Sequence, residues 1–227
     1  MQKRKPFPLL LALVLAAAVS AAGCGSPTGG SDQSTTQGST GGSTTAAAGE
    51  RVEVGDTEAL VWGEGDYGVV MAHGAAYDAA SWEEQAQEIA GSGIVALAPE
   101  DTSPENLLAS IEYLKEERGA RGVALMGASA GGSAVLRATS EEPGAADQLI
   151  LLSATGDVTG LGEEPKLFVA SEGEGMAEEV RRMAEEAPGD QNEALILPGD
   201  AHAQAIFRTG EGDRLMQTIL ERLEERG

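Results

Sequence analysis

Short apolar runs alternate with amphipathic segments from about residue 58 to the end of the chain. Seven apolar runs have the length of strands and are bounded by turn residues: 58–62, 68–72, 94–98, 123–127, 148–153, 166–171 and 193–198. Five segments place their apolar residues on one face, as helices do: 81–93, 104–118, 130–142, 176–187 and 212–227. Because the strand-like runs lack polar alternation, both faces of their sheet are expected to be buried. The pattern predicts an α/β fold, a doubly wound, mostly parallel sheet flanked by helices.

Turn and capping residues mark the ends of these helices. Ser81 is expected to cap the first helix, and Gly93 lies where that helix would end. Pro104 follows Ser103 and suits the first position of the second helix, because its fixed φ is already helical. In such sheets, ligands bind beyond the carboxyl ends of the strands, so the loops at those ends are where functional residues are expected.

The first residues differ from this pattern. Lys3, Arg4 and Lys5 precede an apolar run at 9–19 and a group of small residues, an order typical of a secretory signal peptide. The run is shorter than the roughly 20 residues that span a bilayer. A short membrane anchor is the alternative interpretation.

Cys24 is the only cysteine, so the chain cannot form an internal disulfide. Its setting, "SAAGC", resembles the bacterial lipoprotein box, with Ala21 where Leu is usual. Residues 25–49 are mostly Gly, Ser, Thr, Gln and Ala, the composition of a flexible linker. We therefore expect a signal peptide over 1–23, a lipidated cysteine and linker over 24–49, and a globular domain over 50–227. The protein would be exported and either lipid-anchored to the outer face of the cytoplasmic membrane of a bacterium or secreted.

The chain is strongly acidic, with 37 Asp and Glu against 15 Lys and Arg and a formal net charge of −22. This balance argues against binding to nucleic acid and against close electrostatic binding to anionic lipid. Contact with a membrane is expected through the lipid alone.

The stretch "MGASAGG" at 126–132 contains Gly-x-Ser-x-Gly around Ser129. The bare pattern is weak, because glycine fills 31 of the 227 positions. Its context is stronger, since an apolar strand leads into it and a helix leads out, which suits a sharp turn that exposes a nucleophilic serine. The alternative, a glycine-rich phosphate loop, lacks Gly-Lys-Ser/Thr and has the wrong spacing for a dinucleotide fingerprint.

A nucleophilic serine needs a base and an acid that orients it. The chain has two histidines, and both follow predicted strands. His202 lies after the last strand and is the candidate base, whereas His73 opens the loop "HGAA" and is expected to have a structural role. Three carboxylates follow strands and could orient the base: Glu174, Glu172 and Asp157.

From about residue 56 onwards the chain resembles the α/β-hydrolase family. The resemblance rests on "HG" at 73–74, "GASAGG" at 127–132, a carboxylate two strands later and a histidine after the last strand. The order serine, acid, histidine is that of the family. In size the domain is similar to small members without a cap domain, such as dienelactone hydrolases and small esterases.

The resemblance implies a role for each candidate residue. Ser129 would be the nucleophile, His202 the base and Glu174 the acid, where most members carry Asp. The backbone N–H groups of Ala130 and Ala75 would stabilise the oxyanion. No metal and no organic cofactor is implied.

We expect a serine hydrolase, carboxylesterase-like, that acts on small ester substrates through an acyl-enzyme. Two alternatives remain. The same residues could serve a thioesterase, an acyltransferase or a hydrolase of carbon–carbon bonds. The chain could also be a non-catalytic lipoprotein that uses the hydrolase scaffold for binding or for envelope structure.

Overall fold

The computed structural model describes residues 48–227. The expected signal peptide, Cys24 and nearly all of the expected linker lie outside the described residues. Within residues 48–227, no helix has both the length and the apolar character needed to cross a membrane.

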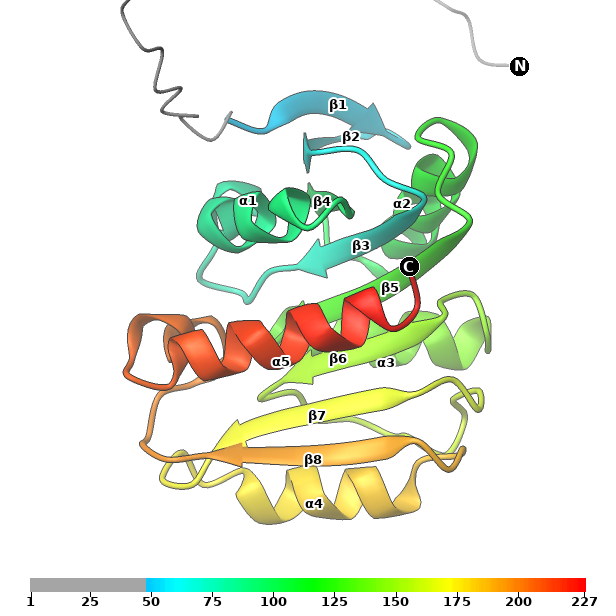
Figure 1. Ribbon diagram of the computed structural model, residues 1–227. Helices are drawn as coiled ribbons and strands as arrows, with labels where there is room; N and C mark the ends of the chain where they lie inside the picture. Colours follow the sequence, from blue (N-terminus) through cyan, green and yellow to red (C-terminus); the bar gives the residue numbers. More distant parts are fainter. Residues whose placement is uncertain (1–47) are drawn as a thin grey trace, which may run out of the picture. The chain divides into compact units, whose positions relative to one another are not determined.

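The described residues contain one eight-stranded sheet with the order β1-β2-β4-β3-β5-β6-β7-β8 (Figure 1). The strands are β1 (Glu50–Val54), β2 (Thr57–Trp62), β3 (Tyr67–Ala72), β4 (Val95–Pro99), β5 (Gly122–Ala128), β6 (Gln148–Leu152), β7 (Lys166–Ser171) and β8 (Asn192–Leu197). β2 pairs antiparallel with β1 and with β4, and all the other pairs are parallel. The mostly parallel sheet predicted from the apolar runs is confirmed.

Helices cover both faces of the sheet. One face carries α1 (Glu83–Gly91) and α5 (Gly212–Glu224), in front in Figure 1. The other carries α2 (Pro104–Glu116), α3 (Ala130–Glu141) and α4 (Ala177–Glu186).

Two hydrophobic cores result, one on each face of the sheet. In β3, Val69 and Met71 belong to the core under α1 and α5, whereas Val70 and Ala72 belong to the core on the opposite face. All four side chains are fully buried. This division explains why the strands read as continuous apolar runs, since each face of the sheet needs apolar side chains.

The structure differs from the predicted elements in three places. β1 was not predicted, because an edge strand with mostly exposed residues lacks an apolar run. The short 3₁₀ helix η2 (Ala203–Arg208) after the last strand was not predicted either. The expected cap at Ser81 is wrong, because Asp78 accepts the N–H of Ser81 at 3.0 Å and caps the 3₁₀ helix η1 (Ala79–Trp82) that precedes α1.

The strand order places the chain's reversal point beside β5. The chain passes from β3 to β4 on one side, and then returns to add β5 on the other side of β3. The register pairs Ala72 with Gly127, so the loop after β3 lies beside the turn after β5. A ligand is expected at such a point, beyond the carboxyl ends of the strands.

Lys166, the first residue of β7, is fully buried, which the sequence pattern did not indicate. Its ammonium group donates to the backbone carbonyls of Gly162, Glu164 and Pro188 at 2.5–2.9 Å. Burial lowers the pKa of this ammonium, and the nearby Glu164 carboxylate, 3.7 Å away, opposes that shift. The ammonium group of Lys166 thus connects the loop before β7 to the loop before β8 by hydrogen bonds.

Candidate active site

Ser129 lies at the junction of β5 and α3, with φ 51° and ψ −115°. Residues other than glycine rarely adopt such a backbone conformation, and it persists only where the surroundings hold it. A Cβ atom on Gly131 would lie 2.4 Å from the carbonyl oxygen of Ala72, and one on Gly127 would lie 2.6 Å from the Cα of Gly132. The glycines of the motif are therefore needed because the turn packs directly against β3 and against the start of α3.

His202, after β8, lies between Ser129 and Glu174, the latter just after β7. The Nε2 atom of its ring is 2.9 Å from the Oγ of Ser129, and its Nδ1 atom is 2.7 Å from the Oε2 of Glu174. Because an ionised carboxylate only accepts hydrogen bonds, Nδ1 carries the proton and Nε2 is left to accept from the serine hydroxyl.

Glu174 is held at its other oxygen. Its Oε1 atom accepts the backbone N–H of Ser171 at 2.6 Å and the hydroxyl of Ser153 at 2.8 Å. The Glu174 side chain is only 3% exposed, whereas the ring of His202 is 50% exposed. The acid side of the arrangement is therefore buried and ordered by hydrogen bonds, and the serine side opens to solvent.

The other two candidate acids lie elsewhere. Glu172 is exposed, two residues before Glu174. Asp157 is exposed, and its Oδ1 atom accepts both the backbone N–H and the hydroxyl of Thr159. These two hydrogen bonds hold the pKa of Asp157 below its usual value. Of the three carboxylates, Glu174 is the one that the structure brings to His202.

His73 contacts backbone rather than Ser129. Its Nδ1 atom is 3.0 Å from the carbonyl oxygen of Gly74, and its Nε2 atom is 3.2 Å from that of Glu100, which follows β4. The ring therefore links the loop after β3 to the loop after β4.

The two N–H groups expected to stabilise the oxyanion, those of Ala130 and Ala75, donate no hydrogen bond within the described residues. Ala130 is the first residue of α3, so its N–H has no acceptor inside the helix. The N–H of Gly74 is used, because it donates to the Oε1 of Gln204 at 2.9 Å, but no hydrogen bond in residues 48–227 uses that of Ala75. Sequence reasoning missed Gln204, and its position two residues after His202 was the only signal for it.

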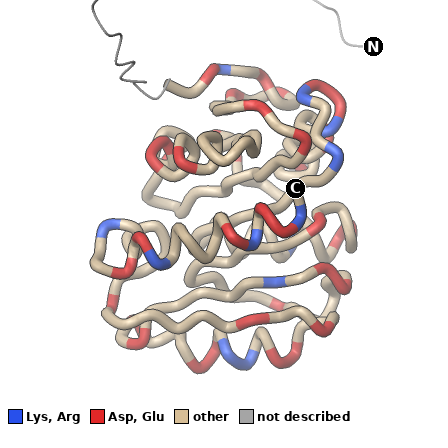
Figure 2. Tube along the Cα trace, viewed as in Figure 1, with Lys and Arg blue, Asp and Glu red and all other residues tan. Residues whose placement is uncertain are grey.

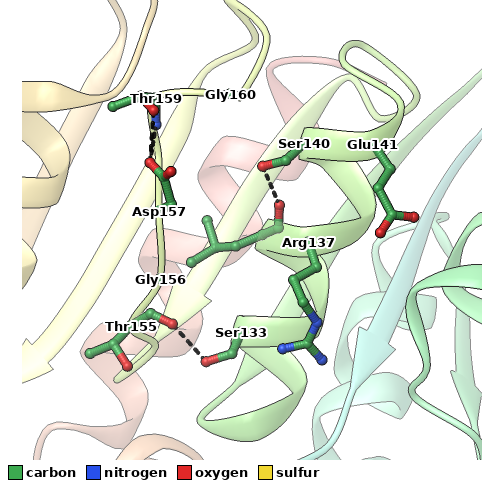
Figure 3. A pocket seen from close by; sticks show the side chains of 10 residues that line it. Ser133, Arg137, Ser140, Glu141, Thr155, Gly156, Asp157, Thr159 and Gly160 are labelled. Atoms are coloured by element: carbon green, nitrogen blue, oxygen red, sulfur yellow. Dashed lines mark hydrogen bonds between the residues drawn. The ribbon is translucent and has the colours of Figure 1, made fainter.

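An open cavity of about 480 Å³ lies between α3 and the loop after β6 (Figure 3). Its wall begins at Ser133, one helical turn after Ser129. The hydroxyl of Ser133 donates to the carbonyl of Thr155 at 2.7 Å. Figure 3 shows the Arg137 side chain extending along α3 toward the level of Ser133. The cavity is lined by hydroxyl groups, the Leu136 side chain and charged groups of both signs.

The charges of the described residues are dispersed. Figure 2 shows the basic residues scattered among a larger number of acidic ones. Within this part of the chain, no three His, Cys, Asp or Glu side chains are grouped so that they could hold a metal ion. The expectation that the protein has no nucleic-acid partner stays a prediction.

No protein-family model matches the chain, and no curated protein matches its sequence. Solved structures do match it in fold. A predicted CIB-like hydrolase from Thermoplasma acidophilum is 17% identical with a TM-score of 0.61, over 79% of this chain and 99% of that one. A dienelactone hydrolase from Anabaena variabilis is 17% identical with a TM-score of 0.62, over 76% and 94%. Est1E from Butyrivibrio proteoclasticus is 15% identical with a TM-score of 0.59, over 79% and 98%.

The chain has the α/β-hydrolase fold. The loop between β6 and β7, residues 153–165, contains neither a helix nor a strand, so no cap domain is inserted there. At these identities the likeness establishes the fold alone, and the chemistry has to be argued from the site.

Proposed function

We propose that the domain is a serine hydrolase of the carboxylesterase type, acting on small ester substrates. The observation that carries the proposal is the continuous contact from Ser129 Oγ to His202 Nε2 and from His202 Nδ1 to Glu174 Oε2, at 2.9 and 2.7 Å. These are hydrogen-bonding distances for a nucleophile, its base and the group that orients the base.

In the first half of the reaction, His202 Nε2 takes the proton of Ser129 as the Oγ atom attacks the ester carbonyl carbon. The carbonyl oxygen becomes an oxyanion, which accepts hydrogen bonds from the N–H groups of Ala130 and Ala75. Each such donor contributes about 3–4 kcal/mol of transition-state stabilisation in comparable sites. The intermediate then collapses, the protonated His202 gives its proton to the departing alcohol oxygen, and an acyl-enzyme remains.

In the second half, a water molecule gives a proton to His202 and attacks the acyl carbon. The tetrahedral intermediate breaks its bond to the Ser129 oxygen, which recovers the proton from His202, and the carboxylic acid leaves. The half-exposed ring of His202 supports this step because water reaches the base without a conformational change. The same exposure favours hydrolysis over acyl transfer, which is most efficient where water is excluded.

The cavity beside Ser133 would hold the part of the substrate that extends from the reacting ester. Its volume of about 480 Å³ is within the range of small-molecule sites. The expected export and lipid anchoring, which concern residues outside the described part, would place this activity at the cell envelope.

The proposal is tested by treating the purified protein with a fluorophosphonate probe, which labels serines that are activated as nucleophiles. Labelling of the wild type that is lost in Ser129→Ala and kept in Ser110→Ala would support the proposal. Ser110 is a buried serine of α2 whose hydroxyl donates to the carbonyl of Asn106, so it controls for the loss of a serine hydroxyl. A folded wild type that is neither labelled nor active on p-nitrophenyl esters would favour a non-catalytic binding protein.

A further inference from the structure

Ser153, the residue directly after β6, joins the two segments that carry Glu174 and His202. Its side chain donates to the Oε1 of Glu174 at 2.8 Å and accepts the backbone N–H of Ala203 at 2.9 Å. Ala203 follows His202 directly, so a single hydroxyl holds the carboxylate of the acid and the backbone of the base. Ser153 is 2% exposed, and solvent does not compete for either hydrogen bond.

Ser153 and Ala203 both have left-handed backbone conformations, with φ of 47° and 51°. Residues other than glycine adopt such angles at a cost, and they persist where surrounding contacts hold them. The hydrogen bond between the Ser153 hydroxyl and the Ala203 N–H is one such contact. Strain is therefore found at both ends of the hydrogen bond that supports His202.

We propose that Ser153 is a positioning residue for the acid and the base, acting through Glu174 and Ala203. This inference rests on the proposed function. With the Ser153 hydroxyl and the Ser171 N–H both on Oε1, the carboxylate is oriented so that Oε2 is left for His202. Without the hydroxyl, Oε1 keeps one donor, the carboxylate gains freedom to rotate, and the buried N–H of Ala203 loses its acceptor.

A hydroxyl suits this position because it donates one hydrogen bond and accepts another at the same time. Alanine at this position would do neither, and would keep the strained φ. Glycine would also do neither, but it adopts φ 47° without strain. Comparing the two variants separates the loss of the hydroxyl from an effect of backbone strain.

The test compares Ser153→Ala, Ser153→Gly and the control Ser110→Ala in two measurements on the whole protein. The first is kcat and KM for p-nitrophenyl acetate. We expect kcat to fall about tenfold or more in both Ser153 variants, with KM within about twofold, since a hydrogen bond to a charged group is lost and substrate contacts remain. Ser110→Ala should retain wild-type kcat.

The second measurement is the low-field proton NMR signal of the His202 Nδ1–H, assigned by its loss in His202→Ala, with His73 as the only other histidine of the chain. We expect this signal to shift or broaden in both Ser153 variants and to stay unchanged in Ser110→Ala. This measurement requires no turnover, so it tests the position of the acid and base even if the protein hydrolyses no ester.

The outcomes distinguish the two proposals. An active wild type with kcat and the His202 signal unchanged in both Ser153 variants would overturn the inference and leave the proposed function intact. A loss confined to Ser153→Ala would also overturn it, because backbone strain would then be the cause. An inactive, unlabelled wild type whose His202 signal still changes in both variants would overturn the proposed function and keep the role of Ser153 as a link between Glu174 and His202.

Discussion

Replacing Glu174 with glutamine should trap His202 in the wrong tautomer. The Oε1 atom accepts two hydrogen bonds, from the Ser171 N–H and the Ser153 hydroxyl, so the amide oxygen of the glutamine takes that place. The amide NH₂ then faces Nδ1 of His202, which has to accept instead of donating. The ring proton therefore moves to Nε2, and Nε2 can no longer take the proton of Ser129.

The size of the expected loss in kcat follows from the loss of the base alone, because glutamine has the shape of glutamate and keeps the packing around it. An acid-to-amide change in the triad of serine proteases lowers kcat about 10⁴-fold with the geometry intact. At 1.36 kcal/mol for each factor of ten, this corresponds to about 5.5 kcal/mol of activation free energy. We expect a loss of this size in kcat, with the free energy of unfolding changed by about 1 kcal/mol at most.

The assay is the steady-state hydrolysis of p-nitrophenyl acetate at neutral pH, with the rate of fluorophosphonate labelling as a second readout. Glu172→Gln is the matched control. It removes the same charge, but from an exposed side chain that lies two residues before Glu174. It should retain wild-type kcat. A Glu174→Gln variant within about tenfold of the wild type would refute the tautomer argument and the assignment of Glu174 as the acid.

Three further changes test the packing and the buried polar groups. Gly131→Ala should destabilise the fold by about 1–3 kcal/mol in a denaturant titration and abolish probe labelling, because the new Cβ atom would meet two backbone carbonyl oxygens at 2.4 and 2.5 Å. The control is Gly91→Ala, at the end of α1, where the new Cβ atom would have open space. This variant should leave the free energy of unfolding unchanged or raise it. Lys166→Met should lower the free energy of unfolding by about 3 kcal/mol or more, because three backbone carbonyls lose their donor. The control Lys115→Met removes one exposed hydrogen bond and should change the free energy of unfolding little. Burial raises the pKa of Tyr67 to about 12, above the unfolded value of 10.0. The unfolded state therefore loses the phenol proton first, and the free energy of unfolding should decline as the pH rises from 10 to 12. In urea titrations at each pH, Tyr67→Phe should lack that part of the decline.

The class of fold and the turn between a strand and a helix at Ser129, the proposed nucleophile, could be predicted from the sequence because both depend on local order. Continuous apolar runs indicate strands buried on two faces, and the helices that lie between most successive runs make the sheet mostly parallel. The small residues around Ser129 indicate a sharp turn between a strand and a helix, and the contacts of Gly131 and Gly127 give the physical reason for them. The sequence predicts His202 as the base because it follows the last strand, which in a parallel sheet ends at the same edge as β5.

The tertiary structure decided which residues meet at that edge. Glu172, Glu174 and Asp157 all follow strands, and their order in the chain does not determine which carboxylate reaches a histidine 28 residues after Glu174. That choice depends on the register of β7 with β8 and on the turn after β7, which buries one carboxylate and exposes its neighbour two residues away. The neighbouring sequence gives no sign of the hydrogen bonds that Ser153 makes, because its partners lie 21 and 50 residues away in the chain. Such hydrogen bonds form only when the strands that carry the residues are paired, so local sequence patterns predict the strands but not the contacts between their ends.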